Sequence, residues 1–227
     1  MTTTTEITLS KNTISILKNF ASMNSNILVK PGNVIRTITP SKNGMGEAKV
    51  DETFDTEFGI WDLNKFLGVI SLFNTPTLEF SEKYVTISGS NGSSVKYYYS
   101  EPKLLTTPTK QVNMPASVAN ISMTEKTFSE LQKASSVLQL PDLSFIGESG
   151  KITATVHDLG DPTSNNYKIV VGDTDATFRF NFKMENIRLL PGNYDIDFAK
   201  NIVGQFTHDT LDLVYWFAME NTSTYSA

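Results

Sequence analysis

The feature that most constrains this chain is a fourfold recurrence of short amphipathic segments, each followed by several extended segments. The amphipathic segments begin near residues 10, 61, 124 and 183, at intervals of 51, 63 and 59 residues. The first three start with a side chain that can cap a helix and continue with apolar residues three or four positions apart. We therefore expect helices over 10–23, 62–73 and 124–138, and one short turn or helix over 183–188.

The rest of the chain is dominated by short extended segments between turn residues. We expect strands at 27–30, 34–39, 84–87, 95–99, 151–157, 167–171, 177–182, 194–198, 202–206 and 211–219. Short strands at regular spacing are typical of antiparallel sheets. The sequence therefore predicts an α+β protein whose helices lie on antiparallel sheets.

One segment separates the repeats into two pairs. Residues 101–110 contain two prolines and show no apolar periodicity, which is typical of a linker. The 227 residues are enough for two domains of about 110 residues each. We expect domains at 1–107 and 108–227, joined by a connector at about 101–115, with two helix-plus-sheet repeats in each domain.

Charge is distributed unevenly over the chain. The net charge is −5, which excludes a uniformly basic protein that coats nucleic acid. The four helical segments hold 7 basic and 4 acidic residues, or +3, and the remainder holds 12 basic and 20 acidic residues, or −8. Two of the four acids, Asp62 and Glu125, lie at helix starts, where the helix dipole favours them.

The basic residues fall on the polar faces of the expected helices. At about 100° per residue, Lys126 and Lys133 lie within about 20° of each other, and Phe128 and Leu131 lie on the opposite side. Such a face is either an ordinary solvated helix surface or a surface that attracts a polyanion. The basic residues of the four segments are Lys11, Lys18, Lys65, Lys126, Lys133, Lys183 and Arg188.

One of these helices carries a distinctive motif. Residues 60–72, Ile-Trp-Asp-Leu-Asn-Lys-Phe-Leu-Gly-Val-Ile-Ser-Leu, resemble a helix motif of the sliding clamps of T4-like bacteriophages, the DNA polymerase processivity factors. Residues 17–25, 110–117, 191–194 and 213–220 resemble other parts of the same family. The resemblance spans the chain at matching length, whereas the Thr-rich start and the last six residues match no part of the family pattern.

The resemblance implies a fold and a function. It implies a DNA-clamp fold of two similar domains, with antiparallel sheets outside and two helices per domain facing the interior of a ring. It implies a head-to-tail homotrimer that encircles double-stranded DNA without reading its sequence. The implied partners are the replicative DNA polymerase, the clamp loader ATPase and the transcription machinery, in the cytoplasm of an infected bacterial host. No membrane contact and no cofactor are expected.

The resemblance also assigns roles to particular residues. The seven basic side chains above would face DNA. Val112 and Met114, apolar residues in a polar connector, would receive a partner peptide, unless they pack the domain junction. Segment 95–99 would join neighbouring subunits along a sheet edge, unless its tyrosines pack in the core; the side chains concerned are Val95, Tyr97, Tyr98 and Tyr99.

Enzymatic chemistry finds little support in the sequence. The chain has no cysteine and no Gly-x-x-x-x-Gly-Lys phosphate loop. The acid pairs at 173–175 and 195–197 are common in turns and on exposed strand faces, so we do not expect a metal nuclease. The alternative to a clamp is a β-rich phage structural or carbohydrate-binding module, which would explain the strands but not the lysine-bearing helices.

Overall fold

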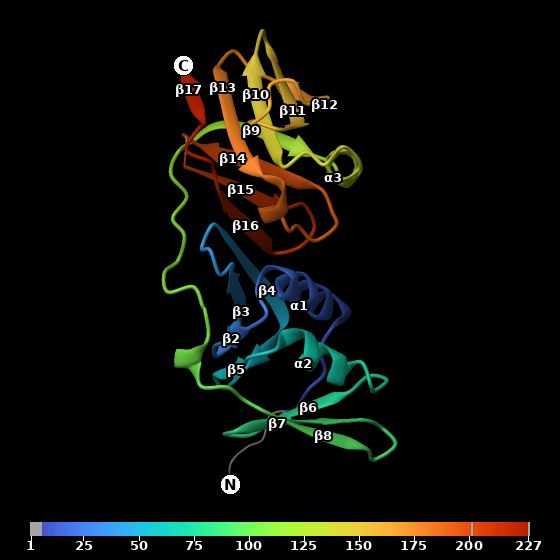
Figure 1. Cartoon of the computed structure of the whole chain (residues 1–227). Helices are drawn as coiled ribbons and strands as arrows, with labels where there is room; N and C mark the ends of the chain where they lie inside the picture. Colours follow the sequence, from blue (N-terminus) through green and yellow to red (C-terminus); the bar gives the residue numbers. More distant parts are fainter. Residues whose placement is uncertain (1–5, 201, 227) are drawn as a thin grey trace. The chain divides into compact units, whose positions relative to one another are not determined.

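A computed structural model describes residues 6–200 and 202–226 of the chain (Figure 1). The chain divides into two compact units, one ending at Lys110 and the other beginning at Gln111. Each unit consists of antiparallel sheets with helices packed on one side.

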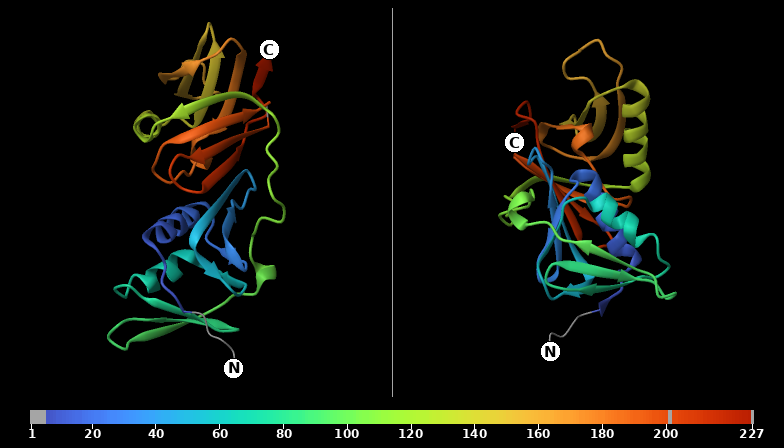
Figure 2. Two further views of the ribbon diagram at one scale, coloured as in Figure 1. Left: turned by 180° about the vertical axis from the view of Figure 1, so that it is seen from behind. Right: turned by 60° about the horizontal axis from the view of Figure 1, so that its bottom comes forward.

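The first unit contains two α-helices. Helix α1 (Lys11–Met23) packs on the β3–β4 hairpin and lies beside α2 (Leu63–Ile70), and both helices occupy one side of the unit (Figure 2). The largest sheet has the strand order β1-β6-β7-β8, and β2 pairs with β5. The strands are β1 (Glu6–Ile7), β2 (Ile27–Val29), β3 (Gly32–Ile38), β4 (Gly44–Phe54), β5 (Phe58–Ile60), β6 (Thr77–Phe80), β7 (Tyr84–Ser88) and β8 (Ser94–Tyr98), and a 3-10 turn, η1, follows at Pro102–Leu104.

The second unit contains one α-helix, α3 (Glu125–Leu138), which packs across β11 and β12. One antiparallel sheet has the order β12-β11-β10-β13-β17, and β16, β15, β14 and β9 follow one another in a second. The strands are β9 (Ser117–Met123), β10 (Asp142–Glu148), β11 (Lys151–His157), β12 (Tyr167–Asp173), β13 (Thr177–Lys183), β14 (Tyr194–Ala199), β15 (Val203–His208), β16 (Leu213–Ala218) and β17 (Thr224–Ser226), with a 3-10 turn, η2, at Met184–Asn186.

The three long helices begin where the sequence predicted. The side chains of Ser10, Asp62 and Thr124 each accept a hydrogen bond from the backbone N–H three residues later. These contacts satisfy donors that the first helical turn would otherwise leave unpaired. The predicted α+β class with antiparallel sheets is confirmed.

Over 183–188, where the sequence predicted a short turn or helix, the structure has the turn and no α-helix. Lys183 is the last residue of β13, because its backbone continues the ladder opposite Asp142. Only the single 3-10 turn η2 follows, and Ile187, which is 1% exposed, then enters the core. Pro191 has no backbone N–H, so the chain could not extend a helix past that point. Within the described residues the second unit therefore has one α-helix, whereas the resemblance implied two per domain.

Several strands were missed from the sequence. The longest is β4, whose 11 residues alternate between buried and solvent-facing positions from Glu47 onward. It contains two glycines and several charged residues, which are rare in strands, so only its alternation could have revealed it. Strands β9 and β10 were missed as well; β10 has buried side chains on both faces and so lacks a clear period of two.

Each unit has an aromatic core between its sheets and helices. In the first unit the rings of Phe54, Phe58 and Phe80 contact one another. In the second unit Phe180 and Phe198 lie at the centre of a larger group of stacked and tilted rings. Aromatic contacts of this kind add to the burial of apolar area, so the sheets hold the helix surfaces in fixed positions.

A buried carboxylate secures the start of α1. Glu52 on β4 is 8% exposed and accepts hydrogen bonds from the Ser10 backbone N–H and from the Thr13 hydroxyl, the latter at 2.5 Å. The positive end of the helix dipole is therefore occupied by a side chain of the protein itself. Strand β4 and helix α1 are joined at this point by charge-assisted hydrogen bonds.

We expect Glu52→Ala to lower the free energy of unfolding by about 2 to 3 kcal/mol, because it leaves the buried Thr13 hydroxyl without its acceptor. Urea unfolding would measure the change. Asp51→Ala is the matched control, since Asp51 is the neighbouring exposed acid on β4, and it should change stability by less than about 0.5 kcal/mol. Equal losses for the two variants would contradict this role of Glu52.

Candidate nucleic-acid interface

The exposed faces of the helices carry lysine and small polar side chains. Helices α1 and α2 contain no acidic residue between their first and last positions. All five lysines on the three α-helices are exposed: Lys11, Lys18, Lys65, Lys126 and Lys133. On α3 the acids are Glu125 in the first turn and Glu130. The three helices thus carry 5 lysines and 2 acids, or +3, on a chain whose net charge is −5.

Most of the helix lysines have no partner of opposite charge. Within the described residues, Lys11, Lys18, Lys65 and Lys133 form no ion pair. On the sheets the pairing is mixed: Arg36 pairs with Glu47 across β3 and β4, and Lys151 pairs with Asp173 across β11 and β12, both at 2.5 Å, whereas other strand residues such as Lys168 have no ion-pair partner within the described residues. The ammonium groups on the helices therefore remain available to an external anion.

Lys126 is an intermediate case. Its side chain is 86% exposed and lies 3.9 Å from Glu130, one helical turn further along. A pair at that distance and exposure contributes little and does not prevent Lys126 from meeting a phosphate. We expect its effect on an anion to be weaker than that of Lys133, which has no acid partner in the described chain.

Two of the seven expected basic residues lie outside the α-helices. Lys183, at the end of β13, donates a hydrogen bond of 2.6 Å to Asp142, whose side chain is only 1% exposed. This contact raises the pKa of Lys183, and its charge is already matched within the protein. Arg188 follows η2 and donates from Nε to the Glu185 carbonyl. The structure therefore does not group these two residues with the five helix lysines.

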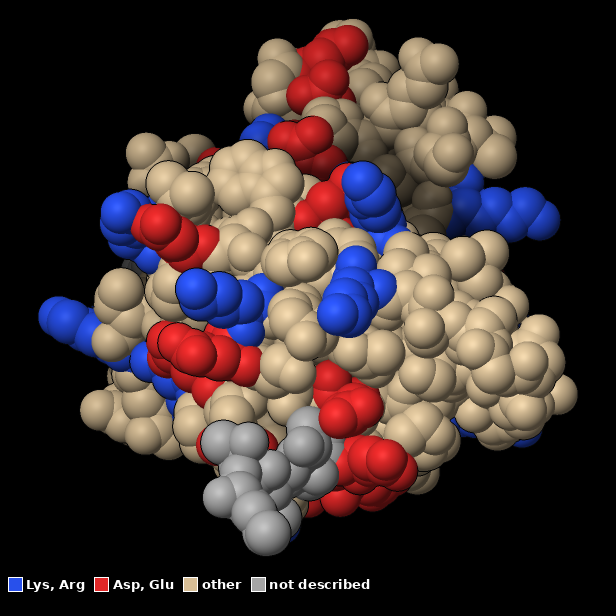
Figure 3. Space-filling view, turned by 90° about the horizontal axis from the view of Figure 1, so that it is seen from below, with Lys and Arg blue, Asp and Glu red and all other residues tan. Residues whose placement is uncertain are grey.

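A different charge pattern covers the side of the first unit that carries β6, β7 and β8. Figure 3 shows this side, where basic and acidic side chains lie interspersed and a broad area has no charge. Residues from 66 to 78 and from 84 to 95 contribute no charged side chain to it.

Strand β8 forms one edge of the first unit's sheet. It pairs with β7 and ends the strand order β1-β6-β7-β8. Tyr97 and Tyr99 face the core, where the ring of Tyr97 contacts Phe66 and the ring of Tyr99 contacts Phe58. Burial raises the pKa of Tyr99 to about 12. Val95 is half-buried, whereas Tyr98 points outward and is 66% exposed.

A second exposed edge was not identified from the sequence. Strand β12 ends the sheet of the second unit, and Val170 on it is 60% exposed while Tyr167 is 37% exposed. Apolar residues at exposed positions of an end strand are the signal that could have indicated it. The two units thus each present an edge strand with an exposed apolar side chain.

The start of the connector is fixed to the first unit. The Asn24 side chain donates hydrogen bonds to the carbonyls of Ile38 and Thr106, and the Thr106 N–H donates to the Asn26 side chain. Further along, Val112 and Met114 are both half-buried. Both apolar residues thus lie in the connector with part of their surface exposed.

Solved structures with this arrangement of helices and sheets define the fold. PCNA from Thermococcus kodakaraensis superposes with a TM-score of 0.70 at 15% identity, covering 95% of this chain and 99% of that one. A. fulgidus PCNA, solved with the C-terminal region of FEN-1 bound, gives a TM-score of 0.68 at 12% identity over 98% of both chains. The protein therefore has the PCNA-like clamp fold.

Sequence relatives are closer and identify the family. Residues 10–110 match the model for the DNA polymerase processivity factor, and residues 121–221 match the C-terminal model of the gp45 sliding clamp. The sliding clamp of Enterobacteria phage T4 is 30% identical over 224 residues, covering 96% of this chain and 98% of the relative. The sliding clamp of Vibrio phage KVP40 is 29% identical over 219 residues, covering 93% and 98%. The chain belongs to the sliding clamp family of phage DNA polymerase processivity factors.

This membership confirms the resemblance and settles two questions about function. Sliding clamps are processivity factors and not enzymes, and the alternative of a phage structural or carbohydrate-binding module is set aside. Over the described ranges, no group of three or more His, Asp or Glu side chains is placed to hold a metal ion. No helix in those ranges is long and apolar enough to cross a membrane.

Proposed function

We propose that three copies of this chain close head to tail into a ring around duplex DNA and tether the replicative DNA polymerase to its template. The observation that carries the proposal is that α1 and α2 carry lysine as their only charged residue type and that, within the described residues, Lys11, Lys18, Lys65 and Lys133 form no ion pair, on a chain whose net charge is −5. In the ring, α1, α2 and α3 face the hole and the sheets face outward.

The proposed inner surface suits sliding rather than tight binding. Lysine is a flexible point charge that attracts phosphates without reading base edges. Because the phosphates repeat regularly along the duplex, the interaction energy is nearly constant along the DNA axis. The acids outside the helices discourage DNA from binding to the outer surface, so the ring is held on DNA by enclosure.

The ring joint would use the two exposed sheet edges. Strand β8 of one subunit would pair with β12 of the next, covering Tyr98 and Val170. The two strands belong to different units of the chain, so the contact is heterologous, and such contacts build rings when the rotation closes. Val95, Tyr97 and Tyr99 would contribute mainly by holding β8 against the core.

Other proteins would operate the ring in the infected bacterial cytoplasm. The chain has no phosphate-binding loop, so a clamp loader ATPase would supply the energy to open it. The transcription machinery is a further partner that we propose from the family. Native mass spectrometry tests the ring: we expect a trimer, and a stable monomer at high protein concentration would overturn the proposal.

The connector is the proposed docking site for the polymerase. The A. fulgidus PCNA of the same fold binds the C-terminal region of FEN-1, which supports a peptide-binding role for clamp surfaces. Val112 and Met114 are the apolar side chains that this connector offers.

We expect Met114→Ala to weaken binding of a polymerase C-terminal peptide about fivefold, because the thioether no longer fills the peptide contact. Calorimetric titration of the peptide into the variant would measure this, after native mass has confirmed its assembly. Gln111→Ala is the matched control at an exposed connector position and should bind normally. A lower melting temperature with unchanged affinity would instead assign Met114 to the domain junction.

A further inference from the structure

The sheet of the second unit has a polar face opposite its aromatic core. The strand register places Lys168, Thr155, Ser144 and Asn181 in one row across β12, β11, β10 and β13. The neighbouring row contains Thr153 and Arg179. Ser144 and Asn181 in this layer are fully buried although they are polar, so the face is covered rather than open to water.

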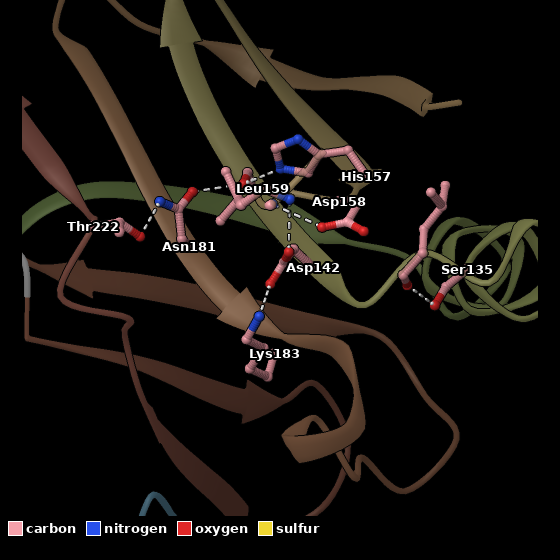
Figure 4. Close-up of polar contacts among 11 residues, drawn as sticks. Ser135, Asp142, His157, Asp158, Leu159, Asn181, Lys183 and Thr222 are labelled. Carbon is pink, nitrogen blue, oxygen red and sulfur yellow. Dashed lines mark hydrogen bonds and ion pairs between the residues drawn. The ribbon is translucent and has the colours of Figure 1, made fainter. Parts of the chain in front are cut away.

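A directed chain of hydrogen bonds crosses this layer (Figure 4). The Asn181 amide donates to the Thr222 hydroxyl, which leaves the Asn181 carbonyl oxygen to accept from Ser144 at 2.6 Å. Because the only proton of the Ser144 hydroxyl is used there, His157 Nε2 must donate to Ser144 Oγ, at 2.7 Å. The other ring nitrogen of His157, Nδ1, is then an acceptor when the imidazole is neutral.

The loop at 158–166 lies over this face and is anchored to it. The Leu159 N–H donates to Oδ2 of Asp142, whose other oxygen accepts from Lys183. Two loop carboxylates are used by the loop itself: Asp158 accepts from the Gly160 N–H, and Asp161 accepts from the N–H and hydroxyl of Thr163. Part of the acceptor capacity of Asp158 and Asp161 is therefore used within the loop and stabilises its conformation.

Between the loop and the sheet lies a polar pocket of about 310 Å³, which we call the outer-face pocket. Its walls include His157, Lys168 and Arg179. Within the described residues, neither Lys168 nor Arg179 has an ion-pair partner. Burial, and next the charge of Arg179, lower the pKa of His157, while the charges of Asp142 and Asp158 act in the opposite direction.

We propose that the outer-face pocket binds a single carboxylate of an acidic peptide segment from a partner protein, held by Arg179 and Lys168. Arg179 supplies a planar set of donors that matches a carboxylate. The hydroxyls of Thr153 and Thr155 on the pocket floor supply further donors. The outer-face pocket therefore offers a different set of contacts from the apolar connector residues and from the exposed helix lysines, and it is a third, distinct site.

The surrounding acids decide which anion the pocket accepts. Glu148, Asp158 and Asp161 also line it, so its lining carries 2 cations and 3 carboxylates. These three carboxylates would repel a polyanion such as DNA. A single carboxylate, by contrast, can pair with Arg179 without lying close to them. A bound carboxylate also favours the protonated form of His157, so binding tightens as the pH falls through the pKa of that residue.

Nuclear magnetic resonance of the full chain, labelled at histidine, tests the proposal. The chain has only 2 histidines, so His208 serves as an internal reference. The probes are the capped peptides acetyl-Gly-Glu-Gly-amide and acetyl-Gly-Gln-Gly-amide, with inorganic phosphate as a third. We expect the Glu peptide to shift the His157 signals and to raise the pH midpoint of the His157 titration. The Gln peptide should leave both the signals and the midpoint unchanged.

Two variants connect the signal to the pocket. Arg179→Gln should weaken binding of the Glu peptide about tenfold, and Lys168→Gln, on the exposed edge strand, should weaken it about threefold without endangering the fold. The proposal is overturned if His157 does not respond, if both variants bind as the unmodified chain does, or if phosphate binds as well as the Glu peptide.

Discussion

A chain carrying Tyr98→Asp is expected to lose the ring and, with it, almost all clamp-dependent processive synthesis. Tyr98 is 66% exposed on the end strand β8, so the substitution should leave the fold of the first unit intact. A carboxylate at that position disfavours strand pairing and would be buried against the exposed Val170 of the neighbouring subunit. Sedimentation velocity would show monomers, and primer extension on a long template would show short products.

Two further variants separate the joint from a general effect of charge. Val170→Asp, on the proposed partner strand, should produce the same monomers. Thr86→Asp adds the same charge to β7, which is paired on both sides and lies next to β8, so this variant should remain trimeric. An intact trimer for Tyr98→Asp, or monomers for Thr86→Asp, would argue against β8 and β12 as the joint.

Replacing Lys18, Lys65 and Lys133 together by alanine is expected to reduce processivity about tenfold at moderate salt. Each substitution occurs three times in the proposed ring, so nine ammonium groups leave the inner surface. The attraction to phosphates depends on counterion release, so the dependence of DNA affinity on salt should become shallower in the variant. Primer extension and loading assays at two salt concentrations would measure both effects.

The control for the lysine variant has the same change in net charge. Lys30, Lys49 and Lys83 are exposed and lie outside the helices, so replacing them by alanine should leave processivity close to that of the unmodified clamp. A ranking within α3 is a finer test, since Lys133→Ala should weaken DNA binding more than Lys126→Ala, which removes a charge already near Glu130. Unchanged processivity of the triple helix variant at every salt concentration would remove α1, α2 and α3 from the DNA surface.

Local chemistry made the helices predictable. Ser10, Asp62 and Thr124 each place an oxygen where the first helical turn lacks an acceptor, and the apolar spacing that follows needs no distant residue to be recognised. Strand β11 was predicted with the same bounds that the structure shows, since its residues alternate between turn signals. The family motif at 60–72 coincides with α2 and its preceding cap.

Features that depend on strand register were not predictable. Asp142 and Lys183 are separated by 41 positions and meet only because β10 and β13 pair in one register. The same register brings Ser144 to Asn181 and creates the covered polar face. An edge strand such as β12 has a hydrogen-bonded neighbour on one side only. The local sequence pattern of a strand does not show whether a second strand pairs with it.

The missing fourth helix has a consequence for the symmetry that DNA would encounter. With three α-helices in the described part of each chain, the proposed ring has nine on its inner wall, so its units alternate between a two-helix and a one-helix surface. The electrostatic potential around the hole is then threefold rather than sixfold. A duplex that advances without rotating presents one full turn of its grooves in about 10.5 base pairs, so it would meet a repeat of this potential about every 3.5 base pairs. The small remaining variation of the interaction energy along the DNA axis would therefore have a period longer than a single base pair.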